Sequence, residues 1–246
     1  MSRRDDILEE IGLTPQWRLR RRQPEAAVSR AAAAATDELP QTEMAAMAEQ
    51  ADGGEQRSER IARMDWPELE RSVGGCTACP LARSRNRTVF GVGDHDADWL
   101  FIGEGPGAEE DRQGEPFVGQ AGKLLDNMLA AIGLRRDANV YIANIVKCRP
   151  PGNRNPEPLE AQACAPYLQR QIALLKPKLI VALGKVAAVN LLQREATIAS
   201  LRGKVHHSGG IPLIVTYHPA YLLRNPPDKS KVWTDLCFAR DTMKTL

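Results

Sequence analysis

The sequence predicts an α/β fold, a three-layer α/β/α domain around a short, mainly parallel, four-stranded central sheet. Short, uniformly apolar segments alternate with amphipathic helical patterns, which is typical of a parallel sheet with helices on both faces. Polar residues directly follow several of these apolar segments, and in such sheets ligands bind beyond the carboxyl ends of the strands. The chain has 246 residues, of which 43% are hydrophobic, so it can bury a sizeable core.

The first sixty residues differ in charge and composition from the rest of the chain. They carry nine Lys and Arg against twelve Asp and Glu, a net charge of −3, so the chain's total of +2 leaves +5 for residues 61–246. Residues 1–22 are expected to form a short helix and a basic arm. Residues 23–60 are rich in alanine and acidic side chains, and we expect a flexible linker because they bury too little apolar surface to offset the ordering entropy. The folded domain is therefore expected at residues 61–246.

Hydrophobic patterning places the expected elements of that domain in order. The expected strands are 99–103, 140–146, 179–183 and 212–217, and the expected helices lie near 122–132, 158–175, 185–193 and 229–245. Four polar residues follow a strand end or lie near one, namely Glu104, Asn144, Lys185 and His218. We therefore expect these side chains to converge on one edge of the sheet.

The stretch from Trp99 to Met128 is predicted to form the floor of an active site. Gly103, Gly105 and Gly107 let the backbone approach a ligand closely, and Pro106 fixes the turn. The alternating glycines differ from the G-x-G-x-x-G fingerprint of dinucleotide-binding proteins. A loop that binds nucleotide phosphates is therefore not expected here.

Three motifs resemble those of the family 4 uracil-DNA glycosylases, the iron–sulfur type. The motifs are GEGPGAEEDRQGEPFVGQAG from Gly103, NIVKCRPPGNR from Asn144 and HPAYLLRNP from His218. With the first cysteines they cover the chain from about Cys76 to its end, in the family's order. The resemblance implies a uracil-DNA glycosylase-like fold. It also implies a monofunctional enzyme of base excision repair, which flips uracil out of DNA and hydrolyses its N-glycosidic bond to leave an abasic site.

Two other functions stay open beside this one. The first is a related glycosylase of broader base specificity, a family whose first motif lacks a carboxylate like that of Glu104. The second is a non-catalytic iron–sulfur module that only binds DNA. Release of free uracil separates an enzyme from a binding module.

Four of the five cysteines are candidate metal ligands. No apolar run is long enough to span a bilayer and the N-terminus lacks the apolar core of a secretory signal, so we expect a cytoplasmic, reducing compartment. Cys76 and Cys79 form a C-x-x-C pair, and Cys148 and Cys164 flank a proline-rich loop. Four thiolates suit a [4Fe–4S] cluster or a zinc ion, and the spacing does not choose between them. The resemblance implies the [4Fe–4S] cluster on these four residues, in a structural role.

Excision of a base needs a stacking platform, groups that read the base and stabilisation of the departing ring. Phe117 is the candidate platform, and a core position under the loop is the alternative. The resemblance assigns Asn144 to reading uracil N3–H and O4, and His218 to uracil O2. Glu104 is the remaining candidate to orient the water or to stabilise the sugar cation. Gly105 stands where related families carry a bulkier side chain, so the exclusion of thymine is expected from another wall of the pocket.

Several basic residues and one apolar residue are expected to contact DNA. The expected contacts are Lys147, Arg149, Arg154, Lys185, Leu222 and Arg224. The segment from Tyr221 to Arg224 is expected to act as a wedge, because apolar side chains can fill the hole left by a flipped base. The start of a helix is the alternative for this segment.

A further resemblance lies in residues 1–22, where the pattern SRRD…L..IGLT.QW.LRR is similar to the N-terminal peptide of the clamp-loader psi subunit. In that protein the peptide binds the chi subunit, and a solvated tail is the alternative here. The expected partners are therefore uracil-containing DNA and, through residues 1–22, the chi subunit. No membrane partner is expected, and the protein is expected to be a monomer.

Overall fold

The computed structural model describes residues 56–246 of the chain. The helix and basic arm expected in residues 1–22 lie outside the described residues, as do residues 23–55 of the expected linker. Residues 56–63 are helical and are followed by helix α3 (Trp66–Gly74). Among the described residues no helix is both long and apolar enough to cross a membrane.

The expected start of the domain, Ile61, falls inside the helix of residues 56–63. Arg57 anchors this helix, because its Nη1 donates to the carbonyl of Ala163 at 3.0 Å and its guanidinium lies 4.9 Å from the ring centre of Tyr167. Ala163 lies 106 positions further along the chain. The composition of residues 23–60 carries no sign of such a long-range contact.

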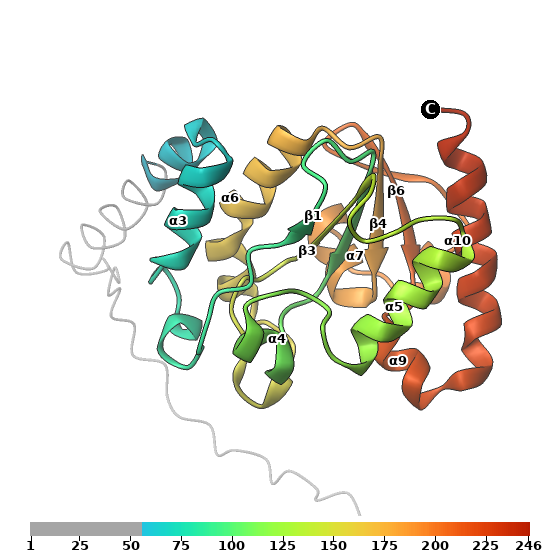
Figure 1. The fold of residues 1–246 in the computed structure, drawn as a ribbon, viewed down its shortest axis with the longest axis horizontal. Coiled ribbons are helices and arrows are strands. Elements are labelled where there is room, and N and C mark those ends of the chain that lie inside the picture. The colour runs from blue at the N-terminus through green and yellow to red at the C-terminus, as the bar shows by residue number, and fades with distance from the viewer. Residues whose placement is uncertain (1–55) are drawn as a thin grey trace, which may run out of the picture. The chain divides into compact units, whose positions relative to one another are not determined.

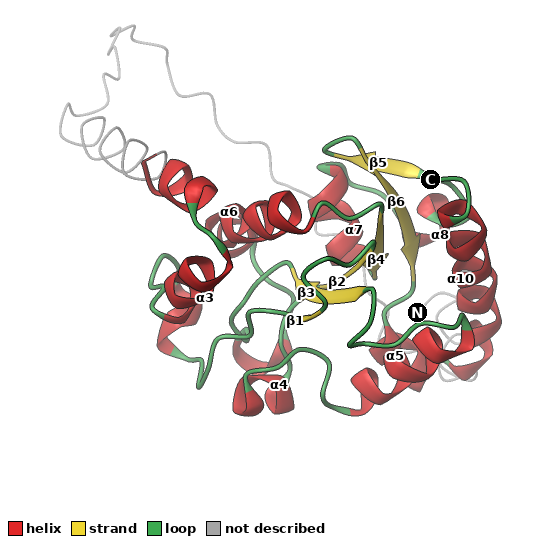
Figure 2. Ribbon diagram, turned by 45° about the horizontal axis from the view of Figure 1, so that its top comes forward, coloured by secondary structure: helices red, strands yellow, loops and turns green. Residues whose placement is uncertain are grey.

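A six-stranded sheet forms the centre of the domain, in the order β1-β3-β2-β4-β6-β5 (Figure 2). The strands are β1 (Val92–Gly93), β2 (Trp99–Gly103), β3 (Val140–Asn144), β4 (Leu179–Leu183), β5 (His206–Ser208) and β6 (Ile211–Thr216). The four central strands are parallel, as expected, whereas β1 and β5 pair antiparallel at the two edges. The prediction of a four-stranded sheet is therefore wrong by two edge strands. Both are only two or three residues long and lack an apolar run, so pairing with a neighbour defines them.

Helices cover both faces of the sheet, and in Figure 1 α3 and α6 (Pro158–Leu175) lie to its left and α5 (Gln120–Ala131) and α10 (Lys229–Met243) to its right. One face carries α3, α6, α7 (Lys185–Leu192) and α8 (Ile198–Leu201), and the other carries α5, α9 (Pro219–Arg224) and α10. Successive residues of β2 point to opposite faces, so Leu100 and Ile102 pack in the first layer while Trp99 and Phe101 pack in the second. The three-layer α/β/α fold is thereby confirmed.

The register of the strands determines where the polar residues at their ends lie. Gly103 at the end of β2 pairs with Asn144 at the end of β3, and Leu183 at the end of β4 pairs with Thr216 at the end of β6. Parallel strands that end level place the residues that follow them at one edge. The short helix α4 (Ala108–Gln113) and the turn η2 (Pro151–Asn153) lie in the loops after β2 and β3.

Candidate active site

A cavity of about 340 Å³ lies at the carboxyl edge of the sheet. The residues that line it include Glu104, Gly105, Phe117, Asn144 and His218. Glu104 directly follows β2, Asn144 ends β3 and His218 follows β6 after one residue, so the structure brings these three together. Lys185 does not line this cavity, and its Nζ lies 3.3 Å from a carboxylate oxygen of Glu195.

Asn144 presents a buried acceptor without a partner. Its side chain is buried, and among the described residues its Oδ1 finds no hydrogen-bond donor. Leaving such a group unsatisfied costs about 1–3 kcal/mol, so native structures seldom keep one without a reason. Because Asn144 lines the cavity, its Oδ1 can accept from an N–H group of a bound ligand.

His218 is held as a neutral donor. It caps the start of α9, where its Nδ1 accepts from the N–H of Ala220 at 3.1 Å. A neutral ring that accepts at Nδ1 carries its proton on Nε2. Burial, and then the charge of Arg224, lowers the pKa of His218 to about 4, so the ring is uncharged at pH 7. His218 is therefore equipped to donate from Nε2 without bringing a charge.

Phe117 and Glu104 supply an apolar face and a carboxylate to the same cavity. The Phe117 ring is buried beneath the loop and still lines the cavity, with its centre 5.5 Å from that of the His218 ring. Phe117 therefore occupies the core position under the loop while its ring also lines the cavity, and its role as a stacking platform stays a prediction. Burial raises the pKa of Glu104 above its ordinary value, because desolvation disfavours the charged form.

Gly105 leaves no room for a side chain. A Cβ at this position would lie 2.8 Å from Cγ2 of Val146, closer than carbon atoms pack. Pro150 and Pro156 lie just beyond this contact. The wall of the cavity at Gly105 is therefore formed by the loop that follows β3.

Two expected DNA contacts are wrong because their side chains are buried. Lys147 is 1% exposed, and its Nζ donates to the carbonyl of Asn144 at 3.0 Å and to Oε1 of Gln171 at 2.6 Å. Leu222 is 1% exposed and packs in the core beneath α9, whereas the next residue, Leu223, is 46% exposed. Packing of the loop after β3 against α6, and of α9 against α5, decides both cases.

Three of the other expected DNA contacts are arginines, and two of these line the cavity. Arg154 lines it, and both its terminal nitrogens donate to the carboxylate of Glu160, at 2.8 and 2.7 Å. Arg149 is partly exposed, and its Nε donates to Oδ1 of Asn153 at 2.7 Å. Arg224 lines the cavity. Arg154 is thus engaged with protein carboxylates, unlike the other two arginines.

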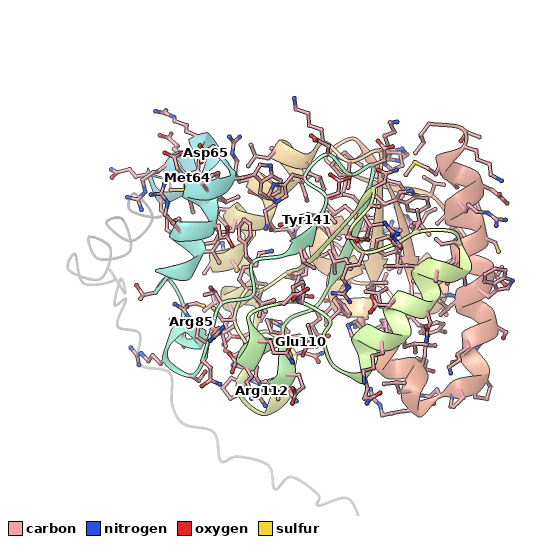
Figure 3. The ribbon with its side chains drawn as sticks, in the orientation of Figure 1. Met64, Asp65, Arg85, Glu110, Arg112 and Tyr141 are labelled. Atoms are coloured by element: carbon pink, nitrogen blue, oxygen red, sulfur yellow. The ribbon has the colours of Figure 1, made fainter. Side chains whose placement is uncertain are left out.

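Glu110 is a site residue that the sequence analysis missed. This residue of α4, labelled in Figure 3, lines the cavity. Its Oε1 accepts from the N–H groups of Val118 and Gly119, both at 3.0 Å, and its Oε2 accepts from the N–H of Gly107 at 3.1 Å. The sequence does contain a sign of this role. Glu110 comes three residues after Gly107, the N-cap of α4, and a glutamate at that position commonly accepts from the main-chain N–H of the capping residue.

The four candidate metal ligands line a second, smaller cavity. Cys76, Cys79, Cys148 and Cys164 come from the loop after α3, the loop after β3 and α6. Burial raises the pKa of the Cys79 and Cys148 thiols, and raises that of Cys164 to about 11. Within residues 56–246, however, no group of three or more His, Cys, Asp or Glu side chains is arranged to hold a metal ion.

Three nitrogen donors contact the sulfurs of this second cavity. The contacts are Arg57 Nη2 to Cys76 Sγ at 3.7 Å, Arg85 Nη1 to Cys148 Sγ at 3.2 Å and the Lys147 main-chain N–H to Cys164 Sγ at 3.3 Å. Arg85 lies on the loop between α3 and β1 (Figure 3). Such donors stabilise sulfur that carries negative charge, as thiolates bound to a metal do.

The fold and the cavity define the class of protein. Residues 90–237 match the family model of the Uracil DNA glycosylase superfamily, and the chain belongs to that superfamily.

Within the superfamily the chain is similar to type-4 uracil-DNA glycosylases. It is 44% identical to the one from Archaeoglobus fulgidus, over 68% of this chain and 88% of that protein. It is 49% identical to the one from Thermotoga maritima, over 62% of this chain and 80% of that protein. For the one from Pyrobaculum aerophilum the identity is 41%, over 70% and 92% of the two chains.

Proposed function

We propose that this protein is a monofunctional uracil-DNA glycosylase that acts in base excision repair. It accepts a flipped uracil in the cavity beside β2 and β3, and hydrolyses the bond between the base and deoxyribose. The observation that carries the proposal is the unpartnered Oδ1 of Asn144, which lines one cavity with the neutral donor of His218 and the ring of Phe117. Uracil offers a matching N3–H donor, carbonyl acceptors and a flat ring.

The cavity stabilises the departing base. As the bond between C1′ and N1 breaks, the bonding electrons leave with uracil and negative charge grows on O2. A donor already aimed at this position needs no reorganisation, and one such donor contributes on the order of 3 kcal/mol to lowering the barrier. His218 supplies it from Nε2, and it stays uncharged because its pKa is lowered to about 4. Asn144 accepts from N3–H and donates to O4 through its amide nitrogen.

Water is the nucleophile, and its oxygen bonds to C1′ as uracil leaves. Glu104 is the carboxylate of the cavity, and it orients this water and supports the positive charge on the sugar. The proposed reaction forms no covalent lysine adduct with the sugar. The products are free uracil and an abasic site.

The DNA contacts differ from those that the sequence predicted. Leu223 is exposed directly beside Arg224 and replaces the buried Leu222 as the apolar side chain that fills the gap left by the flipped base. Arg224 and Arg149 meet backbone phosphates. Arg154 instead braces the wall of the cavity through its pair with Glu160.

We propose that the four cysteines hold a [4Fe–4S] cluster. A single zinc ion requires every sulfur to lie about 2.3 Å from one point. The four sulfurs share one cavity and three of them accept from nitrogen donors, which suits either group, and the resemblance to the iron–sulfur glycosylases favours the cluster. When bound, the cluster joins the segment after α3 to the loop after β3 and to α6. Protein purified without oxygen should contain about four iron and four sulfide per chain, and stoichiometric zinc without sulfide would contradict the cluster.

A labelled oligonucleotide with one uracil tests the main proposal. Free uracil and an alkali-sensitive abasic site are expected from the double strand and the single strand. Binding without release of uracil would instead identify a non-catalytic DNA-binding module. Equally fast release of other deaminated bases would identify a glycosylase of broader specificity.

We also propose that residues 1–22 bind the chi subunit of the replicative clamp loader, on the strength of their resemblance to the psi peptide. The full chain should recover the chi subunit in a pull-down, and a chain that starts at residue 56 should not. Equal recovery by both would contradict this docking role.

A further inference from the structure

The main chain around Phe117 adopts a conformation that side chains seldom take. Its φ is 56°, in the left-handed region, where a residue other than glycine is strained. The carbonyl of Phe117 also approaches the first turn of α5 so closely that a Cβ on Gly122 would lie 1.7 Å from its oxygen. Such a conformation persists only where the surroundings impose it.

Arg136, in the loop after α5, holds the carbonyl side of this turn. Its Nη1 donates to the carbonyl of Pro116 and its Nη2 to the carbonyl of Phe117, both at 2.7 Å. Charged donors at this distance form bonds roughly twice as strong as neutral ones. The planar guanidinium spans two neighbouring carbonyls, which a lysine ammonium does not do with the same geometry.

Arg136 is itself fixed in place by α5. Oδ1 of Asp126 accepts from its Nε at 3.0 Å and from its Nη2 at 2.8 Å, and the arginine side chain is 20% exposed. On the opposite side of the turn, Glu110 accepts from the two N–H groups that follow Phe117. The turn is therefore held between a cation on its carbonyls and an anion on its amides.

We infer that Arg136 is a positioning residue that holds the Phe117 ring in place for stacking on the flipped base. Arg136 does not line the cavity, so it acts through the main chain of Phe117 and not through the base. The inference rests on the proposed function, because it requires that Phe117 stack on the base. Loss of Arg136 releases the strained turn, and a displacement of about 1 Å in a reacting complex can lower the rate by about 10²-fold.

A double-mutant cycle tests this role. The variants are Arg136→Gln, Phe117→Ala and the two combined, and the measurements are kcat and KM for a uracil-containing oligonucleotide. Arg136→Gln should lower kcat/KM by about 10- to 100-fold. In the Phe117→Ala background the same change should lower it by less than about 2-fold, because residues that act through one another are not additive. An equal loss from Arg136→Gln in both backgrounds would overturn the inference.

The neighbouring arginine provides a matched control. Arg135 is exposed and pairs with Asp137, away from the turn, so Arg135→Gln should leave both kinetic constants unchanged. Arg136→Lys keeps the charge without the planar pair of donors, so its kcat/KM should lie between those of the wild type and Arg136→Gln. If Arg136→Gln does not fold, Asp126→Asn replaces it in the cycle, because this change frees the Arg136 side chain without removing it. The loss of kcat/KM caused by Asp126→Asn must likewise vanish in the Phe117→Ala background.

The outcomes separate this inference from the proposed function. Wild-type excision by Phe117→Ala would reject the stacking role and the inference with it. A slow Phe117→Ala beside a fully active Arg136→Gln would reject the role of Arg136 alone. If the wild type and every variant fail to release uracil, the proposed function itself is rejected.

Discussion

The cavity lined by Asn144 (the base cavity) and the cavity lined by the four cysteines (the cysteine cavity) both contain residues of the loop after β3. They differ in whether their polar atoms have hydrogen-bond partners. At the end of β3, Asn144 leaves its Oδ1 unpartnered among the described residues. Four residues later, Cys148 accepts from Arg85, and the sulfurs of Cys76 and Cys164 also have donors. An unsatisfied acceptor suits a ligand that comes and goes, whereas donors on sulfur suit a group that stays.

Lys147 connects the two cavities. Its main-chain N–H donates to Cys164 Sγ, while its Nζ donates to the carbonyl of Asn144 at 3.0 Å. The ammonium is buried, so these contacts are not exchanged for water. A change in the cysteine cavity should therefore reach the base cavity through the main chain, while a change in a side chain that touches the base should leave the cysteine cavity intact.

The largest expected effect is that of Asn144→Asp. This change removes the side-chain N–H donor of Asn144, which lies beside its unpartnered Oδ1. Asn144→Asp places an oxygen opposite uracil O4, and sites built around hydrogen bonds reject such a mismatch by about 10³-fold or more. Single-turnover cleavage of matched strands containing uracil or cytosine measures the loss, with little gain expected on cytosine because it is the poorer leaving group. Near wild-type excision by the folded variant would show that Asn144 does not read the base.

His218 should matter for the rate and little for binding. His218→Ala removes one donor to the developing charge, so single-turnover cleavage should slow by about a few hundred-fold. The dissociation constant for uracil-containing DNA should change by less than about 3-fold, because phosphate contacts supply most of the affinity. A parallel loss of binding would point to a structural histidine.

A change in the cysteine cavity should act first on the stability of the fold. Cys148→Ser is expected to lose iron and sulfide and to lower the free energy of unfolding by at least about 2 kcal/mol. The matched control is Cys237→Ser, because this fifth cysteine does not line the cavity. Both variants are measured by iron analysis and by denaturant unfolding. Equal iron content and equal free energy of unfolding in the two would show that Cys148 has no special role in the cysteine cavity.

The pH dependence should follow Glu104. Burial raises its pKa, so the carboxylate takes up a proton at a higher pH than an ordinary glutamate, and the single-turnover rate should fall as the pH drops through that raised value. His218 stays neutral until the pH nears 4, so its protonation contributes only at the acid end. Glu104→Gln should be slow and should lack this acid limb. An unchanged acid limb in Glu104→Gln would assign it to another group.

The smallest expected effect is that of shortening the chain. A protein that starts at residue 56 should keep its turnover on short oligonucleotides within about 2-fold, because residues 23–55 are too poor in apolar side chains to contribute a core. Starting at residue 61 also removes Arg57 with its contacts to Cys76 and Ala163. That loss of about 1 kcal/mol should lower the melting temperature by about 2–4 °C. Identical melting of the two truncated proteins would show that Arg57 does not support the cysteine cavity.

The sequence by itself determined the parallel centre of the sheet and the residues at its carboxyl edge. Strands buried on both faces are apolar throughout, so they can be recognised in the sequence as apolar runs. The polar residue that follows each run must then lie at the carboxyl edge of the parallel sheet. Glu104, Asn144 and His218 were located in this way before any contact was known. The three motifs added the family.

Only the tertiary structure decided which charged residues are buried and which contacts hold the cavity together. Lys147 and Leu222 follow the same local patterns as exposed residues, and packing against α6 and α5 buried them. The edge strands, the anchor at Arg57 and the turn held by Glu110 and Arg136 depend on partners far along the chain or across a loop. Local periodicity describes which face of an element is apolar, but it carries no information about which other element that face will meet.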